Sequence, residues 1–150
     1  MKVITSILLL LASTTMYSQM DNVVGEYFYL AGENGKHLTE YTLTLQEDGT
    51  FHFHSYEDHQ RGISWERNKY GKGNWRMDGK IVSFITDKEK DIDEKYTLDF
   101  SNSKARFITK PERDKTDRKI ETKLQFFESE IFWIERLKIL KNKNAIQQRP

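Results

Sequence analysis

The feature that most constrains this chain is an alternation of apolar and polar residues with a period of two. Tyr41, Leu43 and Leu45 alternate with polar residues, and residues 51–54 repeat the pattern as Phe-His-Phe-His. Successive side chains of an extended strand point to opposite faces, so this period gives each strand one apolar and one polar face. Because the pattern recurs along most of the chain, it predicts an all-β fold.

Turn-forming residues divide the alternating stretches into short segments. Asp48-Gly49 and Asp78-Gly79 are dipeptides typical of tight hairpin turns. The segments expected to be strands are residues 25–30, 41–45, 51–53, 73–77, 80–86, 96–100, 104–109, 120–127 and 131–138. About eight to nine short antiparallel strands in one domain are typical of a small up-and-down barrel or a sandwich.

The connections between these segments alternate between long and short. The long ones are residues 31–36, 57–69, 87–95 and 110–119, and the short ones are residues 47–49, 78–79, 101–103 and 128–130. In an up-and-down meander, successive connections lie at opposite ends of the strands. We therefore expect all four long loops to form a mouth at one end of the barrel, where loops carry function on a rigid scaffold.

Residues 1–19 have the composition of a signal peptide. Lys2 is followed by an apolar run at residues 3–12 and by small or polar residues at 13–19. Such a run is too short to cross a bilayer and fits the apolar region of a secretory signal. We expect cleavage near residues 18–20 and export of a soluble protein, periplasmic or secreted, with no integral membrane segment. Residues 20–138 then form the barrel domain, and residues 139–150 a polar C-terminal tail.

The composition excludes several classes of protein. The 150 residues include no cysteine, and the formal net charge is +1. A disulfide scaffold and cysteine metal sites are thereby excluded, and the near-zero charge argues against a nucleic-acid partner.

The sequence also resembles the lipocalin-like (calycin-type) β-barrel domains of small exported bacterial proteins. The resemblance is carried by Val24-Gly25-Glu26-Tyr27 and by the hairpin segments 43–51 and 73–82. It implies a barrel of eight strands or slightly more and a binding role. The family's first-strand motif is a glycine, any residue and a tryptophan covered by a basic residue of the last strand. Tyr27 takes the place of that tryptophan here, with Arg136 or Lys138 as its basic partner.

The leading functional hypothesis is binding of a small, partly apolar molecule at the mouth. Aromatic and basic side chains near the long loops are the candidates for contacting it, with two further aromatic residues lining the interior. The mouth residues are Trp65, Tyr70, Arg61 and His59, and the lining residues are Tyr41 and Trp75. The interior of an eight-stranded barrel either holds one small ligand or is filled by side chains, and the many aromatic residues leave both alternatives open.

Two alternatives belong to other classes. A filled barrel with mixed-charge loops suits an inhibitor or immunity factor that neutralises a toxin or hydrolase in the envelope, because rim charges set partner choice. A weaker alternative is a surface zinc or copper site formed by His52, His54 and His59. The sequence contains none of the common catalytic motifs, so we expect neither an enzyme nor a cofactor.

Overall fold

The computed structural model describes residues 22–33, 35–60, 63 and 65–142. The signal peptide predicted at residues 1–19, the candidate residue Arg61 and most of the predicted tail lie outside these residues. Among the residues described, no helix has the length and apolar character needed to span a bilayer.

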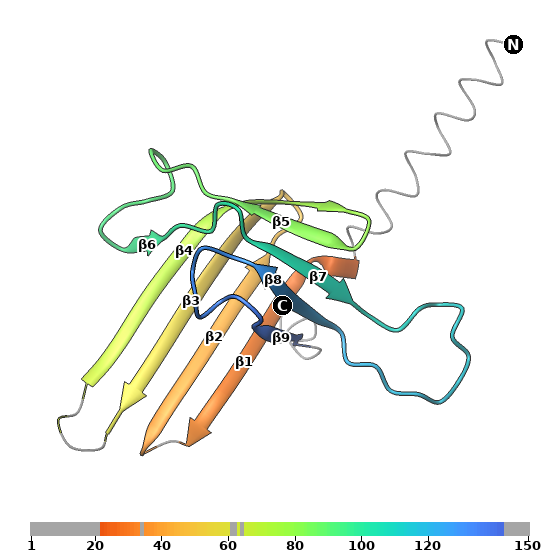
Figure 1. The fold of residues 1–150 in the computed structure, drawn as a ribbon, viewed down its shortest axis with the longest axis horizontal. Helices are drawn as coiled ribbons and strands as arrows, with labels where there is room; N and C mark the ends of the chain where they lie inside the picture. Colours follow the sequence, from red (N-terminus) through yellow and green to blue (C-terminus); the bar gives the residue numbers. More distant parts are fainter. Residues whose placement is uncertain (1–21, 34, 61–62, 64, 143–150) are drawn as a thin grey trace, which may run out of the picture.

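The described chain consists of β-strands joined by turns and loops (Figure 1). The strands are β1 (Gly25–Glu33), β2 (His37–Leu45), β3 (Thr50–His59), β4 (Trp65–Asp78), β5 (Ile81–Ile85), β6 (Tyr96–Leu98), β7 (Lys104–Ile108), β8 (Lys123–Glu128) and β9 (Lys138–Lys141). The all-β fold predicted from the alternation is confirmed.

Eight of these strands close into an antiparallel up-and-down barrel. The order around it is β1-β2-β3-β4-β5-β7-β8-β9, and β9 returns to pair with β1. The closing ladder is short, with Tyr27 opposite Lys141 and Phe28 opposite Leu140. The barrel class predicted from the sequence is therefore confirmed, with one further strand outside the barrel.

That further strand, β6, corrects the predicted meander. Residues 96–100 were expected to form an antiparallel barrel strand, but β6 pairs in parallel with β4 at Tyr70 and Gly71. β5 pairs directly with β7, which leaves no place for β6 between them. The physical reason lies in the segment that follows β6, because it places Phe100 in the core against Gly71 of β4 and so holds β6 beside β4.

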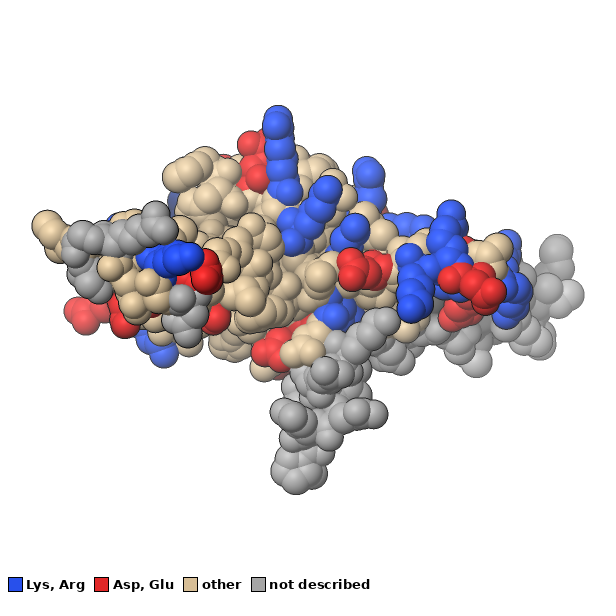
Figure 2. All heavy atoms as spheres, turned by 90° about the horizontal axis from the view of Figure 1, so that it is seen from below, with Lys and Arg blue, Asp and Glu red and all other residues tan. Residues whose placement is uncertain are grey.

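Removing β6 from the barrel changes which connections share an end. The loop at residues 109–122 follows β7 and lies at the end of the β4–β5 turn, opposite the β1–β2 and β3–β4 connections (Figure 1). Figure 2 shows basic and acidic side chains interspersed at the end of the molecule that carries this loop. The prediction of one mouth with all four long loops is wrong, and the β8–β9 connection at residues 129–137 takes the place of 109–122 at that end.

Further boundaries differ from the prediction. β1 extends into the predicted loop 31–36, and β3 and β4 extend into the predicted loop 57–69, so both connections are shorter than expected. The predicted strand 131–138 is instead a turn segment, and the strand begins at Lys138. The predicted tail therefore starts within β9, which the barrel needs for closure.

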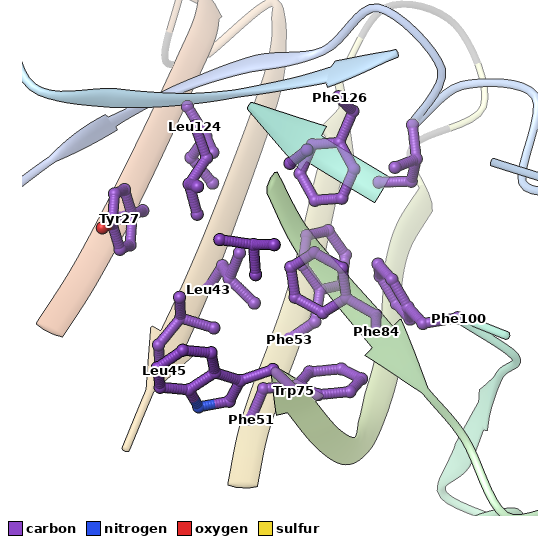
Figure 3. Close-up of a cluster of buried hydrophobic side chains, with 14 of the residues drawn as sticks. Tyr27, Leu43, Leu45, Phe51, Phe53, Trp75, Phe84, Phe100, Leu124 and Phe126 are labelled. Atoms are coloured by element: carbon purple, nitrogen blue, oxygen red, sulfur yellow. The ribbon is translucent and has the colours of Figure 1, made fainter. Parts of the chain in front are cut away.

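Aromatic side chains fill the centre of the barrel (Figure 3). The Phe51 ring lies 5.1 Å from that of Phe84, and Phe84 stacks on Phe126 at 5.4 Å. Phe53 lies 5.0 Å from Phe100. These separations are those of direct aromatic contact, so the rings occupy space in which an eight-stranded barrel can otherwise hold a small ligand.

Phe100 enters this core from outside the barrel strands. It follows β6, is fully buried, and lies over the inner face of β4 at Gly71. A Cβ atom at Gly71 would lie 2.7 Å from a ring atom of Phe100, so only glycine leaves room for this contact. Gly73, two residues along the same face, would place a Cβ 2.2 Å from the Ile85 carbonyl oxygen. The glycines of β4 thus permit the β5–β7 connection to close the core.

We expect Phe100→Ala to destabilise the protein by about 3–5 kcal/mol, because it removes a fully buried ring and leaves a cavity. Phe132→Ala is the matched control, since its ring is 85% exposed, and its cost should stay within about 0.5 kcal/mol. Urea unfolding followed by circular dichroism measures both. Equal stabilities of the two variants would contradict the role of Phe100 in the core.

Candidate functional site

The long strands β1–β4 continue beyond the part of the barrel that the short strands close. Pairing of β1 with β9 ends at Phe28, and pairing of β4 with β5 covers only Asn74–Asp78. The remainder forms a four-stranded sheet at the lower left of Figure 1. We call this sheet, made of residues 29–33, 37–41, 55–59 and 65–69, the extension.

The strand register arranges the inward side chains of the extension in three rows. Each row contains one residue of every strand, directly opposite its neighbours. The inner row is Tyr29, Tyr41, Ser55 and Lys69; the middle row is Ala31, Thr39, Glu57 and Arg67; the tip row is Glu33, His37, His59 and Trp65. Neighbouring rows are two residues apart along each strand, which corresponds to about 7 Å. The distance from the inner row to the tip row is therefore about 13 Å.

An aromatic shelf forms at the inner row. Tyr29 and Tyr41 stack at 5.3 Å, and the Trp133 ring lies 5.1 Å from that of Tyr41. Trp133 comes from the β8–β9 connection, which the fully buried Ile134 anchors in the core. The Lys69 ammonium lies 5.7 Å from the centre of the Trp133 ring. We call Tyr29, Tyr41 and Trp133 the shelf, which lies on the filled core and carries a cation at its side.

The Tyr41 hydroxyl keeps its proton over a wide pH range. Burial, with the negative charge of Glu57 and the neighbouring Tyr29 as smaller causes, raises the pKa of Tyr41 to about 12. All three causes disfavour the phenolate. At neutral pH the largely buried Tyr41 therefore keeps its proton, and its hydroxyl can both donate and accept hydrogen bonds.

A second group of side chains contacts one another near the tip. Nδ1 of His37 lies 3.4 Å from Nδ1 of His59, and the His59 ring stacks on Trp65 at 5.5 Å. The Arg67 guanidinium lies 4.8 Å from the centre of the Trp65 ring and 3.8 Å from a Glu57 oxygen. The middle row is thus neutralised by its own ion pair, while the tip presents imidazole and indole rings.

The structure brings together some of the residues predicted from the sequence. His59 and Trp65 are neighbours in the tip row, and Tyr41 lies in the inner row of the same surface. These three belong to one surface, although His59 and Trp65 are strand residues and not part of a loop.

Two other predicted residues lie elsewhere. Tyr70 faces the outside of the barrel, where its ring stacks on His54 at 4.6 Å. Trp75 is buried in the core near the β2–β3 turn, and its Nε1 donates to the Gln46 carbonyl oxygen at 3.1 Å. Trp75 is therefore part of the packing and does not line the open end.

The three histidines proposed for a metal site are not brought together. His52 and His54 share the outer face of β3, as their spacing predicts, whereas His59 lies on the inner face beside His37. Residues of one strand that are an odd number of positions apart lie on opposite faces. His54 and His59 both belong to β3 and are five positions apart, so their side chains point to opposite faces. In the part of the chain that the structure describes, no group of three or more metal-binding side chains occurs.

Sequence reasoning missed several residues of the extension. Trp133 was assigned to a barrel strand, and Lys69 and Glu57 to a loop. Tyr29 was detectable, because it is two residues from Tyr27 and so shares its inward face. The pairing of His37 with His59 could not be predicted from the sequence, because it depends on the register between β2 and β3.

A basic residue of β9 lies near the Tyr27 ring, as the resemblance predicted, but it is not one of the two predicted residues. Lys141 of β9 places its ammonium 6.0 Å from the centre of the Tyr27 ring. The Tyr27 hydroxyl donates to the Val23 carbonyl oxygen at 2.5 Å. Arg136 and Lys138, the predicted partners, lie before and at the start of β9.

Comparison with protein-family models, with curated proteins and with solved structures found no match to this chain.

We expect Glu57→Gln to lower the pKa of the Tyr41 hydroxyl from about 12, because removing a nearby negative charge favours the phenolate. Burial remains, so the pKa should stay above the ordinary tyrosine value of about 10. A pH titration of tyrosine ring carbons by NMR measures it, with Glu47→Gln in the distant β2–β3 turn as the control. An unchanged pKa in Glu57→Gln would show that Glu57 does not act on Tyr41.

Proposed function

We propose that this protein is an exported, non-enzymatic, lipocalin-like binding protein that holds a small, partly apolar ligand on the inward face of the extension. The observation that carries the proposal is the shelf. Tyr29 and Trp133, both partly buried, pack on the buried Tyr41 ring at the end of a filled barrel. The barrel is a rigid support in this account, and the ligand lies on its open end.

The side chains around the shelf indicate the chemistry of the ligand. A flat or extended apolar group fits against the three rings, since aromatic surfaces bury large apolar areas at low entropic cost. Lys69 forms no ion pair among the described residues, so its charge is available to an anionic group. The Tyr41 hydroxyl adds a hydrogen-bonding group beside it. The ligand we propose is therefore an apolar molecule with one acidic group.

The tip row extends the same surface. An elongated ligand on the shelf reaches Trp65 and His59 only if it spans about 13 Å along the strands. The contact predicted between Trp65 and the ligand is therefore proposed for an elongated ligand only. A compact ligand is held by the shelf alone and does not reach Trp65.

We expect the dye anilinonaphthalene sulfonate, an apolar ring system with one negative charge, to bind at the shelf. Trp133→Ala should weaken binding about tenfold, because losing an aromatic contact costs about 1.5 kcal/mol. Lys69→Gln should weaken it several-fold, and Lys80→Gln, at the opposite end, should not. Dye fluorescence measures the affinity, and thermal unfolding confirms that each variant is folded.

Trp65→Ala is the matched tryptophan variant of this experiment. Unchanged dye binding is expected, because the dye is shorter than the distance from shelf to tip. Loss of binding in Trp65→Ala with full binding in Trp133→Ala would move the site to the tip and contradict the proposal.

An inhibitor or immunity role at the same end is the second candidate. It is favoured by Ile63 and Phe132, whose side chains are 90% and 85% exposed in the β3–β4 and β8–β9 connections. Exposed apolar side chains near an aromatic surface are typical of protein interfaces. Co-purification of a stoichiometric partner that is lost in Phe132→Ser would support this candidate over the small ligand.

A further inference from the structure

The outer side of β1 carries a free strand edge that the barrel leaves unpaired. β1 runs to Glu33, but its ladder with β9 includes only Tyr27 and Phe28. The amide of Asn142 donates to the Glu26 carbonyl oxygen at 2.8 Å, so even-numbered residues of β1 direct their main-chain groups toward β9. Two residues beyond Phe28, Leu30 directs its N–H and C=O toward Lys138 at the start of β9, but among the described residues the ladder does not continue to this pair.

A half-open groove of about 620 Å³ lies along this edge. Phe28, Leu30 and Leu140 give it an apolar lining, and their side chains are 38%, 53% and 41% exposed. Its size is within the range of pockets that hold ligands. The groove thus combines free backbone hydrogen-bonding groups with an apolar surface, the two features by which a sheet edge binds an added strand.

The opposite edge of the extension is protected, whereas this one is not. Residues 65–69 of β4 read Trp-Glu-Arg-Asn-Lys, and such charges prevent pairing with other chains. Residues 29–32 of β1 read Tyr-Leu-Ala-Gly, with neither a charge nor a proline. Natural proteins seldom leave an apolar edge of this kind exposed unless it has a partner.

The charges around the groove select the partner. Lys123 and Lys138 line it and form no ion pair within the described part of the chain, while Glu121 is the single acidic residue of the lining. Lys141 also lines it, but its ammonium donates to the Asn22 carbonyl oxygen at 2.6 Å. Pairing of two copies of β1 would bring the lysines of both copies together, which is unfavourable. An acidic segment, in contrast, neutralises them.

We propose that this groove binds an extended, acidic segment of a partner polypeptide, which adds to β1 as a strand. Apolar side chains of the segment contact Phe28, Leu30 and Leu140, and its carboxylates pair with Lys123 and Lys138. The groove shares Tyr29 with the shelf, but none of the residues named here for binding the segment belongs to the shelf, so either site can be disproved without the other.

The probe is a short synthetic peptide in which Val and Glu alternate, labelled with a fluorophore, and its anisotropy measures binding to the full chain. We expect the peptide to bind, and a peptide in which Val and Lys alternate not to bind. Lys138→Glu should weaken binding several-fold, while Lys80→Glu, at the β4–β5 turn, makes the same charge change without effect. Equal binding of both peptides would overturn the proposal.

Two substitutions of Leu30 separate the contribution of its backbone N–H to peptide binding from the contribution of its side chain. Leu30→Pro removes the edge N–H, which points away from β2, and should weaken binding about tenfold relative to Leu30→Ala, because a lost hydrogen bond costs about 1.4 kcal/mol. Thermal unfolding establishes that both variants fold. Equal binding of the two variants would overturn strand addition. Protection of the Leu30 amide from hydrogen exchange without peptide, in a protein that sediments as a dimer, would assign the edge to a second copy and also overturn the proposal.

Discussion

The packing of aromatic rings at the centre of the barrel is the interaction on which the rest of the structure depends. Phe51, Phe53 and Phe84 contact Phe100, which the β5–β7 connection supplies from outside the barrel strands. A barrel of eight strands has room either for these rings or for a ligand, but not for both. The aromatic packing at the centre is therefore why the proposed function places the ligand at the end of the barrel.

The second determinant is the unequal length of the strands. β1–β4 have 9, 9, 10 and 14 residues, whereas β5, β7, β8 and β9 have 5, 5, 6 and 4. The long strands therefore continue as a sheet, and in the described part of the chain no strand covers its inward face or pairs with its two edges. The inward face carries aromatic rings and a cation, and the β1 edge borders an apolar groove. Two surfaces of different chemistry arise from one difference in length.

Much of the fold could be predicted because its determinants are local. Alternation identified the strands around Leu43 and Phe53, and Asp48-Gly49 and Asp78-Gly79 identified their turns. The position of β6 could not be predicted, because it depends on the contact of Phe100 with Gly71, residues far apart in the sequence. That single error changed the end of the barrel to which the later loops were assigned.

The candidate site was predicted only in part for a related reason. Tyr41 follows from the inward period of its own strand, whereas His59 and Trp65 were predicted in the loop 57–69 and lie on strands of the extension. Trp75 faces the interior as predicted, but Tyr70 was misplaced, because the face of a residue near a predicted loop depends on strand length and register, which the sequence does not show. Trp133 was missed as a shelf residue, since a turn with an apolar anchor resembles a short strand in sequence.

The central claim, that ligands bind on the open end and not inside the barrel, is tested most directly by the indole N–H signals of the tryptophans in an NMR titration with anilinonaphthalene sulfonate. Trp75 reports on the core and Trp133 on the shelf. The account predicts that the Trp133 signal shifts with dye concentration while the Trp75 signal does not. A shift of Trp75 with Trp133 unchanged would place the dye inside the barrel and contradict the account.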